Sequence, residues 1–230
     1  MSNCAEVVVL VEGLTEQRFV KQLLAPCLAN RGVYITAIIL DKPGEKGGDV
    51  KFDRAKNDIG RHLKQRPNTW ITLLVDYYGI RNDWPGYRES VSRPDSQQKA
   101  ETMCRATATE VNRLYPELNT GRRFIPYFSM HEIEALYFSD PTVLANNLSV
   151  QQSHVEAILM ECGSPEEINN SPSTAPSKRL ATLCPRYKKT TTGITIASSI
   201  GLEKMRVRCP LFDDWLSRLE SLKGIVHATS

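Results

Sequence analysis

The sequence lacks the paired cysteines and histidines that mark a zinc-binding motif. None of its six cysteines belongs to a Cys-x-x-Cys pair, and its four histidines form no cluster beside them. This spacing argues against a zinc knuckle, and no cysteine lies in a pattern typical of a catalytic nucleophile. The cysteines are Cys4, Cys27, Cys104, Cys162, Cys184 and Cys209.

Long apolar runs are also absent. No stretch approaches the roughly 20 residues that are needed to cross a bilayer, so we expect no membrane association. No signal-peptide pattern is present, and we therefore expect a cytoplasmic protein with free thiols. The glycine-rich segment 44–48 does not end in the Gly-Lys-Ser/Thr sequence of a nucleotide-binding P-loop.

Excess charge is small, because the formal net charge is only +3. That value does not argue for a nucleic-acid partner by itself, but the basic residues gather late in the chain. Such a cluster is either a solvated cationic surface or a patch that follows a phosphate backbone, and one of its members could stabilise transition-state charge. The predicted nucleic-acid contacts in this region are Arg179, Arg186, Lys189 and Arg206.

What the sequence does contain is an alternation of strands and helices. The apolar run 6–11 predicts a strand that is buried on both faces, and helical spacing over 15–29 followed by a strand at 33–40 completes a βαβ unit. We expect further helices at 52–65 and 95–115 and further strands at 70–78 and 122–128. The pattern predicts an α/β fold with a mostly parallel four-stranded sheet flanked by helices.

Strand signals end near residue 139. A helical segment is expected at 131–138, and short helices are expected at 150–162, 177–184, 195–200 and 210–222. We therefore predict an α/β core over 1–139 and a helical C-terminal extension over 140–230 that packs on the core. Segments 41–50, 79–94 and 169–179 are expected to be loops because of their glycine, proline and polar content.

Acidic residues close the predicted strands. Glu12 ends the first strand, Asp76 ends the third, and Glu132 and Glu134 follow the fourth. Ligands of parallel α/β sheets collect outside the carboxyl ends of the strands, so these carboxylates should converge. Converging carboxylates repel one another unless a cation neutralises them, and an all-oxygen set favours Mg²⁺ or Mn²⁺. Such ions support phosphoryl-transfer chemistry.

Each of these acids has a simpler interpretation. Glu12 could be a surface acid at a strand end, and Glu16 could lie in the first turn of its helix because of the helix dipole alone. One of Glu132 and Glu134 could simply face solvent, and their two-residue spacing places them on different sides of a helix, so we do not expect both to ligate one ion. His131 could assist proton transfer or cap the helix. The aromatic residues Tyr77, Tyr78, Trp84 and Tyr87 could stack on bases or pack internally.

Several motifs together resemble a bacterial family of unknown function that is related to the TOPRIM domain. They include "VVVLVEGLTEQRFVKQLLAPCL", "LLVDYYGIRNDWPG", "HEIEALYFSDP" and the late "APSKRL…YKKTTTG" segment, so the resemblance covers nearly the whole chain. TOPRIM domains occur in topoisomerases, primases and nucleases of the overcoming-lysogenisation-defect type. The resemblance implies a TOPRIM-like sheet.

The resemblance also implies roles for individual residues. TOPRIM domains share a glutamate after the first strand and an Asp-x-Asp motif after a later one, which together bind Mg²⁺; these positions match Glu12 and Asp76. The nuclease branch adds a second acid, here Glu16, and an acid on a later helix, here Glu132 or Glu134. It also tends to use a late lysine, for which Lys178 and Lys188 are the candidates.

One position departs from the TOPRIM pattern. The second aspartate of Asp-x-Asp is replaced by Tyr78, and Asp83 could substitute for it only where the following loop folds back. The predicted metal ligands are therefore Glu12, Asp76 and Glu134, with Asp83 as a conditional fourth.

The resulting functional hypothesis is a Mg²⁺-dependent nuclease that acts on DNA or RNA. The resemblance further implies an ATPase partner and a role in defence against phage or mobile DNA. The alternative, favoured by Tyr78, is a catalytically degenerate module that binds or regulates a partner ATPase or nucleic acid. A third hypothesis is phosphoryl transfer on a small phosphate compound.

Overall fold

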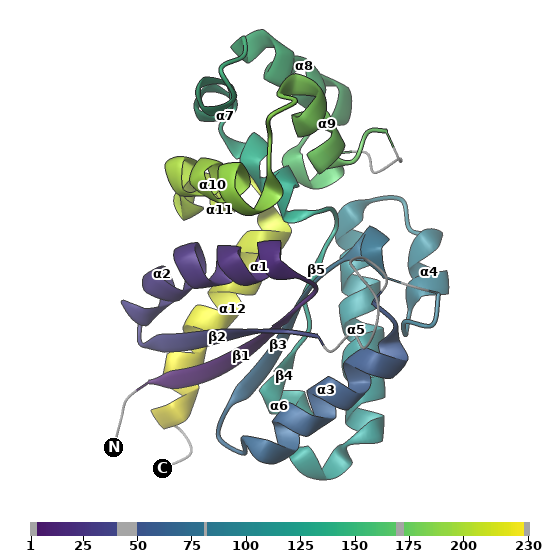
Figure 1. Ribbon diagram of the computed structural model, residues 1–230. Helices are drawn as coiled ribbons and strands as arrows, with labels where there is room; N and C mark the ends of the chain where they lie inside the picture. Colours follow the sequence, from purple (N-terminus) through teal and green to yellow (C-terminus); the bar gives the residue numbers. More distant parts are fainter. Residues whose placement is uncertain (1–3, 41–49, 81, 169–172, 228–230) are drawn as a thin grey trace.

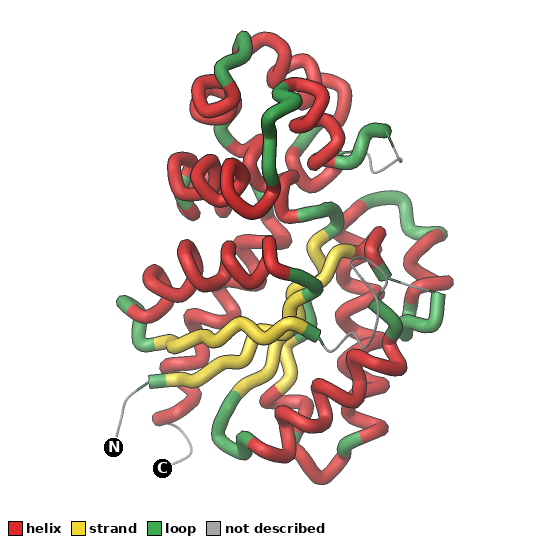
Figure 2. The backbone as a smooth tube through the Cα atoms, in the orientation of Figure 1, coloured by secondary structure: helices red, strands yellow, loops and turns green. Residues whose placement is uncertain are grey.

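A parallel β-sheet lies between two layers of helices, and a further group of helices lies beyond one end of the sheet (Figures 1 and 2). The computed structural model describes residues 4–40, 50–80, 82–168 and 173–227. The strand order is β2-β1-β3-β4, with β5 also paired to β3, and all these pairings are parallel. The strands are β1 Ala5–Val11, β2 Val33–Ile39, β3 Trp70–Asp76, β4 Phe124–Ile125 and β5 Phe128–Ser129. The predicted α/β class with a mostly parallel sheet is thus confirmed.

The continuous apolar sequence of β1 follows from its position next to the sheet centre. Val7, Val9 and Val11 belong to the core on one face of the sheet, whereas Val8 and Leu10 belong to the core on the other. Because successive side chains of a strand point to opposite faces, a strand that is covered on both sides needs apolar residues at every position.

The first face of the sheet is covered by the helical run that follows β1 and by the last helix of the chain. The run consists of α1 Leu14–Phe19, a π-helical segment Val20–Leu24 and α2 Ala25–Ala29. The sequence predicted a single helix here. The π segment ends next to Pro26, which has no amide to donate and whose ring would clash with the preceding turn of a regular helix.

The second face is covered by α3 Phe52–Gln65 and α5 Ser96–Leu114. Both helices were predicted within one residue of these ends. The side chain of Asp95 caps α5 by accepting a hydrogen bond from the Gln98 amide at 2.8 Å. The expected loop after β3 contains a short helix, α4 Tyr87–Val91, and the expected loop 41–50 lies, apart from its last residue, outside the described residues.

The fourth predicted strand differs from the expectation. Residues 120–123 form the helical turn α6 Thr120–Arg123, and the strand that follows is split into β4 and β5. Pro126 lies in the gap between them. Proline cannot donate a backbone hydrogen bond, so the pairing with β3 stops there and resumes at Phe128.

The C-terminal region is helical, as expected, but it contains two helices that were not predicted. One of them, α7, carried a recognisable signal, since the side chain of Asp140 caps its start ahead of Pro141. No helix in the described part of the chain is long and apolar enough to cross a membrane. The helices are α7 Pro141–Leu148, α8 Gln152–Cys162, α9 Pro176–Leu183, α10 Ile194–Ile200, α11 Leu202–Arg208 and α12 Pro210–His227.

Trp215 anchors α12 to the sheet. Its indole Nε1 donates a hydrogen bond to Thr72 Oγ1 on β3 at 2.9 Å, and its ring stacks on Tyr127 with the ring centroids 4.6 Å apart. The side chain is only 1% exposed. A residue near the C-terminus therefore completes the core of the N-terminal sheet.

We expect Trp215→Ala to destabilise the protein by about 3–5 kcal/mol, because it leaves a cavity and removes the hydrogen bond to Thr72. Thermal or chemical denaturation would measure the loss. Val207→Ala is the matched control, since Val207 is 80% exposed and should change stability by less than about 0.5 kcal/mol. Equal stability of the two variants would contradict the proposed anchoring.

Candidate metal centre at the carboxyl edge of the sheet

The ends of β1 and β3 bring Glu12 and Asp76 together. The two strands are neighbours, and Val11 pairs with Leu74. Continuing this register places Glu12 beside Val75, one residue before Asp76. On its other side, Asp76 pairs with Ser129 of β5, and the acidic segment 131–134 follows directly.

Gly79 provides the space into which the carboxylate of Glu12 fits. A Cβ atom at this position would lie 2.9 Å from Glu12 Oε2 and 3.3 Å from its Oε1, and 3.4 Å from the Cβ of Asp76. The first distance is shorter than a normal contact. A glycine three residues after Asp76 therefore lets the two acids lie side by side, and the sequence alone gave no indication of this contact.

The surroundings of Asp76 are unfavourable for a charged carboxylate. Burial raises its pKa well above the usual value, and the charges of the four neighbouring glutamates raise it further. Its Oδ1 atom is buried and accepts no hydrogen bond from the described residues. The neighbours are Glu12, Glu16, Glu132 and Glu134. The four predicted acids and Glu16 thus form one cluster.

Glu16 belongs to this cluster from the first turn of α1. Burial raises its pKa, and Glu132 adds to this effect, whereas its backbone hydrogen bonds and the charge of Lys189 oppose it. Its Oε2 would be 3.2 Å from a Cβ atom at Gly13. Interaction with the helix dipole alone therefore does not describe its surroundings.

Lys189 supplies positive charge to the cluster. Its Nζ lies 2.5 Å from Glu132 Oε1 and 3.6 Å from Glu134 Oε1. Burial lowers the pKa of Lys189, but Glu134 and Glu132 outweigh that effect and raise it above the usual value. Burial raises the pKa of Glu132. Lys189 and the Ser177 amide, which donates a hydrogen bond to Glu132 at 2.9 Å, outweigh this effect, so the pKa of Glu132 lies below its usual value.

Glu134 is completely buried. Burial raises its pKa to about 7, against the opposing charge of Lys189. Tyr187 donates a hydrogen bond to its Oε1 at 3.4 Å, whereas Oε2 accepts none from the described residues. The simpler interpretation, in which one of Glu132 and Glu134 faces solvent, does not hold, because Glu132 precedes the tight 3₁₀ helix Ile133–Ser139 and both carboxylates reach Lys189. Whether both ligate one ion stays a prediction.

The two lysines that the resemblance singled out are not the one that reaches the acids. Lys178 and Lys188 are exposed, and Arg186 is exposed as well. Lys189, which was predicted to contact nucleic acid, lies in the cluster instead. Adjacent lysines carry no sequence signal that says which of them turns inward; the π-helical turn Lys189–Gly193 decides it.

Two of the predicted nucleic-acid contacts are engaged within the protein. Arg179 forms a bidentate pair with Glu161, with nitrogen–oxygen distances of 2.9 and 3.0 Å. Arg206 pairs with Asp213 and Glu220, which join α11 to α12. Both arginines are largely covered, so their ion pairs stabilise helix packing and correct the prediction that they are open to a phosphate backbone.

Asp83 does not lie where it could act as the conditional fourth metal ligand. It is exposed, and its Oδ2 accepts a hydrogen bond from the Asp53 amide at 3.4 Å. Its recorded contact is therefore with the first turn of α3.

The residues present fit a magnesium or manganese ion held by few protein ligands. Among the described residues, no three histidine, cysteine, aspartate or glutamate side chains are arranged to hold a metal. Mg²⁺, however, usually keeps several waters and is bound by one or two carboxylates together with substrate phosphates. Glu12 and Asp76 can supply such a pair. The buried Oδ1 of Asp76 accepts no hydrogen bond from the described residues.

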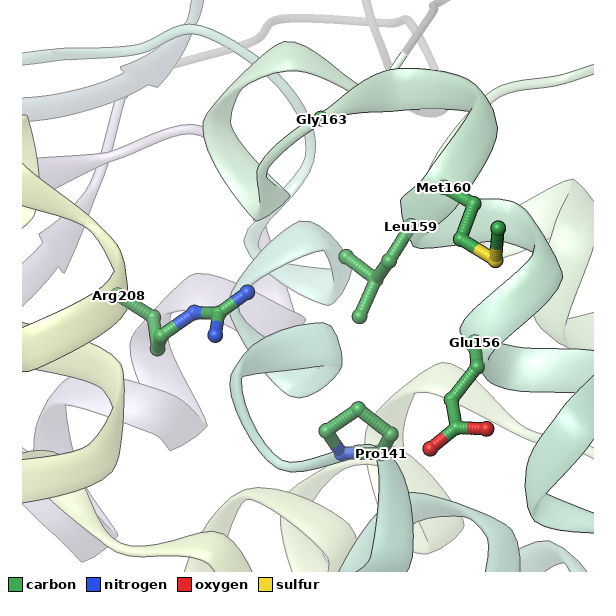
Figure 3. A pocket seen from close by; sticks show the side chains of 6 residues that line it. All are labelled: Pro141, Glu156, Leu159, Met160, Gly163 and Arg208. Carbon is green, nitrogen blue, oxygen red and sulfur yellow. The ribbon is translucent and has the colours of Figure 1, made fainter.

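A separate hollow of about 490 Å³ lies in the C-terminal helical region (Figure 3). Arg208 and Glu156 approach it from opposite sides in this view. None of the clustered acids lines it, so it is distinct from the carboxylate cluster. The lining residues are Pro141, Glu156, Leu159, Met160, Gly163 and Arg208.

Comparison with known proteins gives one family and one solved structure. A family model described as "Domain of unknown function (DUF4276)" matches residues 11–220. No curated protein matches the chain. The chain is similar to the C-terminal region of the Xanthomonas campestris pv. campestris OLD protein, with a TM-score of 0.44 and 14% identity over 96% of this chain and 97% of that one. A similarity of this degree carries no argument about function.

We expect Lys189→Met to lower the thermal stability of the protein. The change leaves the buried Glu134 and the largely buried Glu132 without their cation, and an unsatisfied buried group costs about 1–3 kcal/mol. Differential scanning calorimetry would measure the effect. Lys188→Met is the matched control because Lys188 is exposed; a control that is as destabilised as Lys189→Met would refute the assignment.

Proposed function

The chain belongs to the DUF4276 family, and we propose that it is a divalent-cation-dependent nuclease that hydrolyses phosphodiester bonds of DNA or RNA. The observation that carries this proposal is the position of Asp76. Its carboxylate lies next to Glu12, is surrounded by further acids, and has a buried oxygen that accepts no hydrogen bond from the described residues. An external cation is the partner that would satisfy this arrangement.

Glu12 and Asp76 are the residues that would hold Mg²⁺ or Mn²⁺. When bound, the cation would polarise a phosphate oxygen and offset the charge that develops during hydrolysis. Glu132 and Glu134 hold Lys189 in place, and the side chain of Lys189 remains 42% exposed. Lys189 is therefore available to contact an anionic phosphate beside the two acids.

The resemblance of the Glu12 and Asp76 motifs to the TOPRIM domain adds to this proposal, since TOPRIM nucleases use acids at matching positions. Cooperation with an ATPase, and a role in defence against phage or mobile DNA, stay predictions from the same resemblance. The division into a core at 1–139 and an extension at 140–230 likewise stays a prediction.

The second candidate is a catalytically degenerate module that binds or regulates a partner ATPase or nucleic acid. Two observations favour it: Tyr78 occupies the position of the second aspartate, and the described residues hold no three-ligand metal group. Calorimetric titration with Mn²⁺ separates the candidates, because a degenerate site would not bind the ion.

We expect Glu12→Gln and Asp76→Asn each to reduce Mg²⁺- or Mn²⁺-dependent cleavage by more than about 100-fold, since even second-shell changes at metal sites cost 10–100-fold. Cleavage of labelled DNA and RNA measures activity, and titration calorimetry measures Mn²⁺ binding. Asp83→Asn is the control and should retain both, because its side chain contacts α3. Full cleavage by Glu12→Gln, or no cleavage by the wild type with either ion, would reject the proposal.

We expect Gly79→Ala to weaken Mn²⁺ binding while the protein remains folded. The added methyl group would lie 2.9 Å from Glu12 Oε2 and would force that carboxylate to move. Gly121→Ala is the matched control, because a Cβ atom there has no neighbour within 4 Å. Calorimetric titration and circular dichroism of both variants provide the test, and unchanged Mn²⁺ affinity of Gly79→Ala would show that the ion does not depend on this position of Glu12.

A further inference from the structure

Of the four aromatic residues that follow Asp76, Tyr78 is the most exposed, and Tyr87 is half-buried. The relative exposure of Tyr78 is 45%, whereas Tyr77 and Trp84 are each 2% exposed. The hydroxyl of Tyr77 is hydrogen-bonded with Ser90 Oγ at 2.8 Å, and the indole of Trp84 donates to the carbonyl of Val50. These two side chains are therefore committed to the interior, and Tyr78 has a different role.

The ring of Tyr78 is held in a fixed orientation. It stacks on His131 with centroids 5.5 Å apart and an interplanar angle of 20°, and Tyr77 meets it edge-on at 5.0 Å and 88°. His131 is itself 5% exposed, so the support beneath the ring is buried. A supported ring with a large exposed surface loses little side-chain entropy when another planar group packs on it.

Tyr78 also belongs to the chain segment that carries the acid site. It is two residues past Asp76 and directly precedes Gly79, over which the Glu12 carboxylate lies. A second exposed apolar side chain, Leu14 at 58%, stands in the sequence between Glu12 and Glu16. Apolar surface is therefore exposed next to the acid cluster on both of the segments that contribute to it.

We propose that Tyr78 stacks on an unpaired nucleobase next to the phosphate that occupies the acid cluster, and that this contact makes the protein select single-stranded or locally unpaired nucleic acid. This inference rests on the proposed nuclease function and adds its substrate class. Bases in a duplex are stacked on their neighbours and offer only their edges, whereas the face of an unpaired base is free to stack on an aromatic side chain.

The same contact gives a physical meaning to the departure from Asp-x-Asp. A carboxylate at position 78 would add another acid to a region that already holds Asp76 and four glutamates. A neutral ring adds no charge and provides a surface for a base. In this interpretation, the replacement of the second aspartate exchanges a metal ligand for a substrate contact.

The test is equilibrium binding of a fluorescent single-stranded oligonucleotide of roughly 12 nucleotides, which is within the usual site size of single-strand binders, in Ca²⁺ to limit cleavage. Tyr78→Leu should weaken binding by about 5- to 150-fold, because stacking of a base contributes about 1–3 kcal/mol. Tyr78→Phe should retain wild-type affinity. Tyr34→Leu, which removes a tyrosine that is 54% exposed at the opposite edge of the sheet, should leave binding unchanged.

A scan with single abasic positions separates stacking from a structural role. The wild type should lose a similar factor when one particular base is missing, and Tyr78→Leu should show no additional loss with that oligonucleotide. Equal additional loss in the variant, a wild type with no base-sensitive position, or a wild type that prefers duplex would each overturn the proposal. The wild-type scan decides the matter even where Tyr78→Leu fails to fold.

Cleavage measured in parallel distinguishes this inference from the proposed function. Cleavage of single strands and duplexes at equal rates, by both the wild type and Tyr78→Leu, would leave the nuclease in place and remove the stacking role. Tyr78-dependent binding without cleavage in Mg²⁺ or Mn²⁺ would remove the nuclease and leave a nucleic-acid-binding module.

Discussion

Asp76 and four glutamates lie near one another where β1, β3 and β5 end, and one lysine reaches into the group. Carboxylates in such a position lose hydration and repel one another, and each effect favours the protonated form. The pKa of Glu134, which burial raises to about 7, and the raised pKa of Asp76 are the signs of this cost. Much of the surrounding structure can be understood as a response to it.

The C-terminal helices contribute to that response, because they deliver Lys189. The turn that carries it is fixed to α1 by Arg18, which donates a hydrogen bond to the carbonyl of Thr190 at 2.6 Å. Gly193 ends the turn, and a Cβ atom there would lie 2.8 Å from the hydroxyl of Tyr187, the tyrosine that donates to Glu134. Trp215 meanwhile fixes α12 to β3. The acid cluster thus takes the cation contact of Lys189 from the C-terminal helical region.

The sequence predicted what depends on local pattern. A buried strand that ends in an acid is visible in the order of residues, so β1, β3, Glu12 and Asp76 could be placed at one edge of a parallel sheet. The role of Gly79 could not be predicted, because it depends on how closely two chain segments approach. The choice between Lys188 and Lys189 was inaccessible for a related reason, since a single π-helical turn determines which ammonium group faces the acids. The ion pairs of Arg179 and Arg206 depend in the same way on the packing of distant helices.

The unequal distribution of positive charge within the cluster indicates where the proposed cation would bind. Glu132 and Glu134 have the tethered ammonium of Lys189, which is always present and needs no ion from solution. The buried oxygen of Asp76 accepts no hydrogen bond from the described residues, and the negative charges of all four glutamates repel this carboxylate. A divalent ion would gain most from binding beside Asp76, where it would offset the charge of that carboxylate. It would then lie two residues along the chain from Tyr78, so a phosphate drawn to the ion would bring the adjoining base toward the exposed ring of that tyrosine.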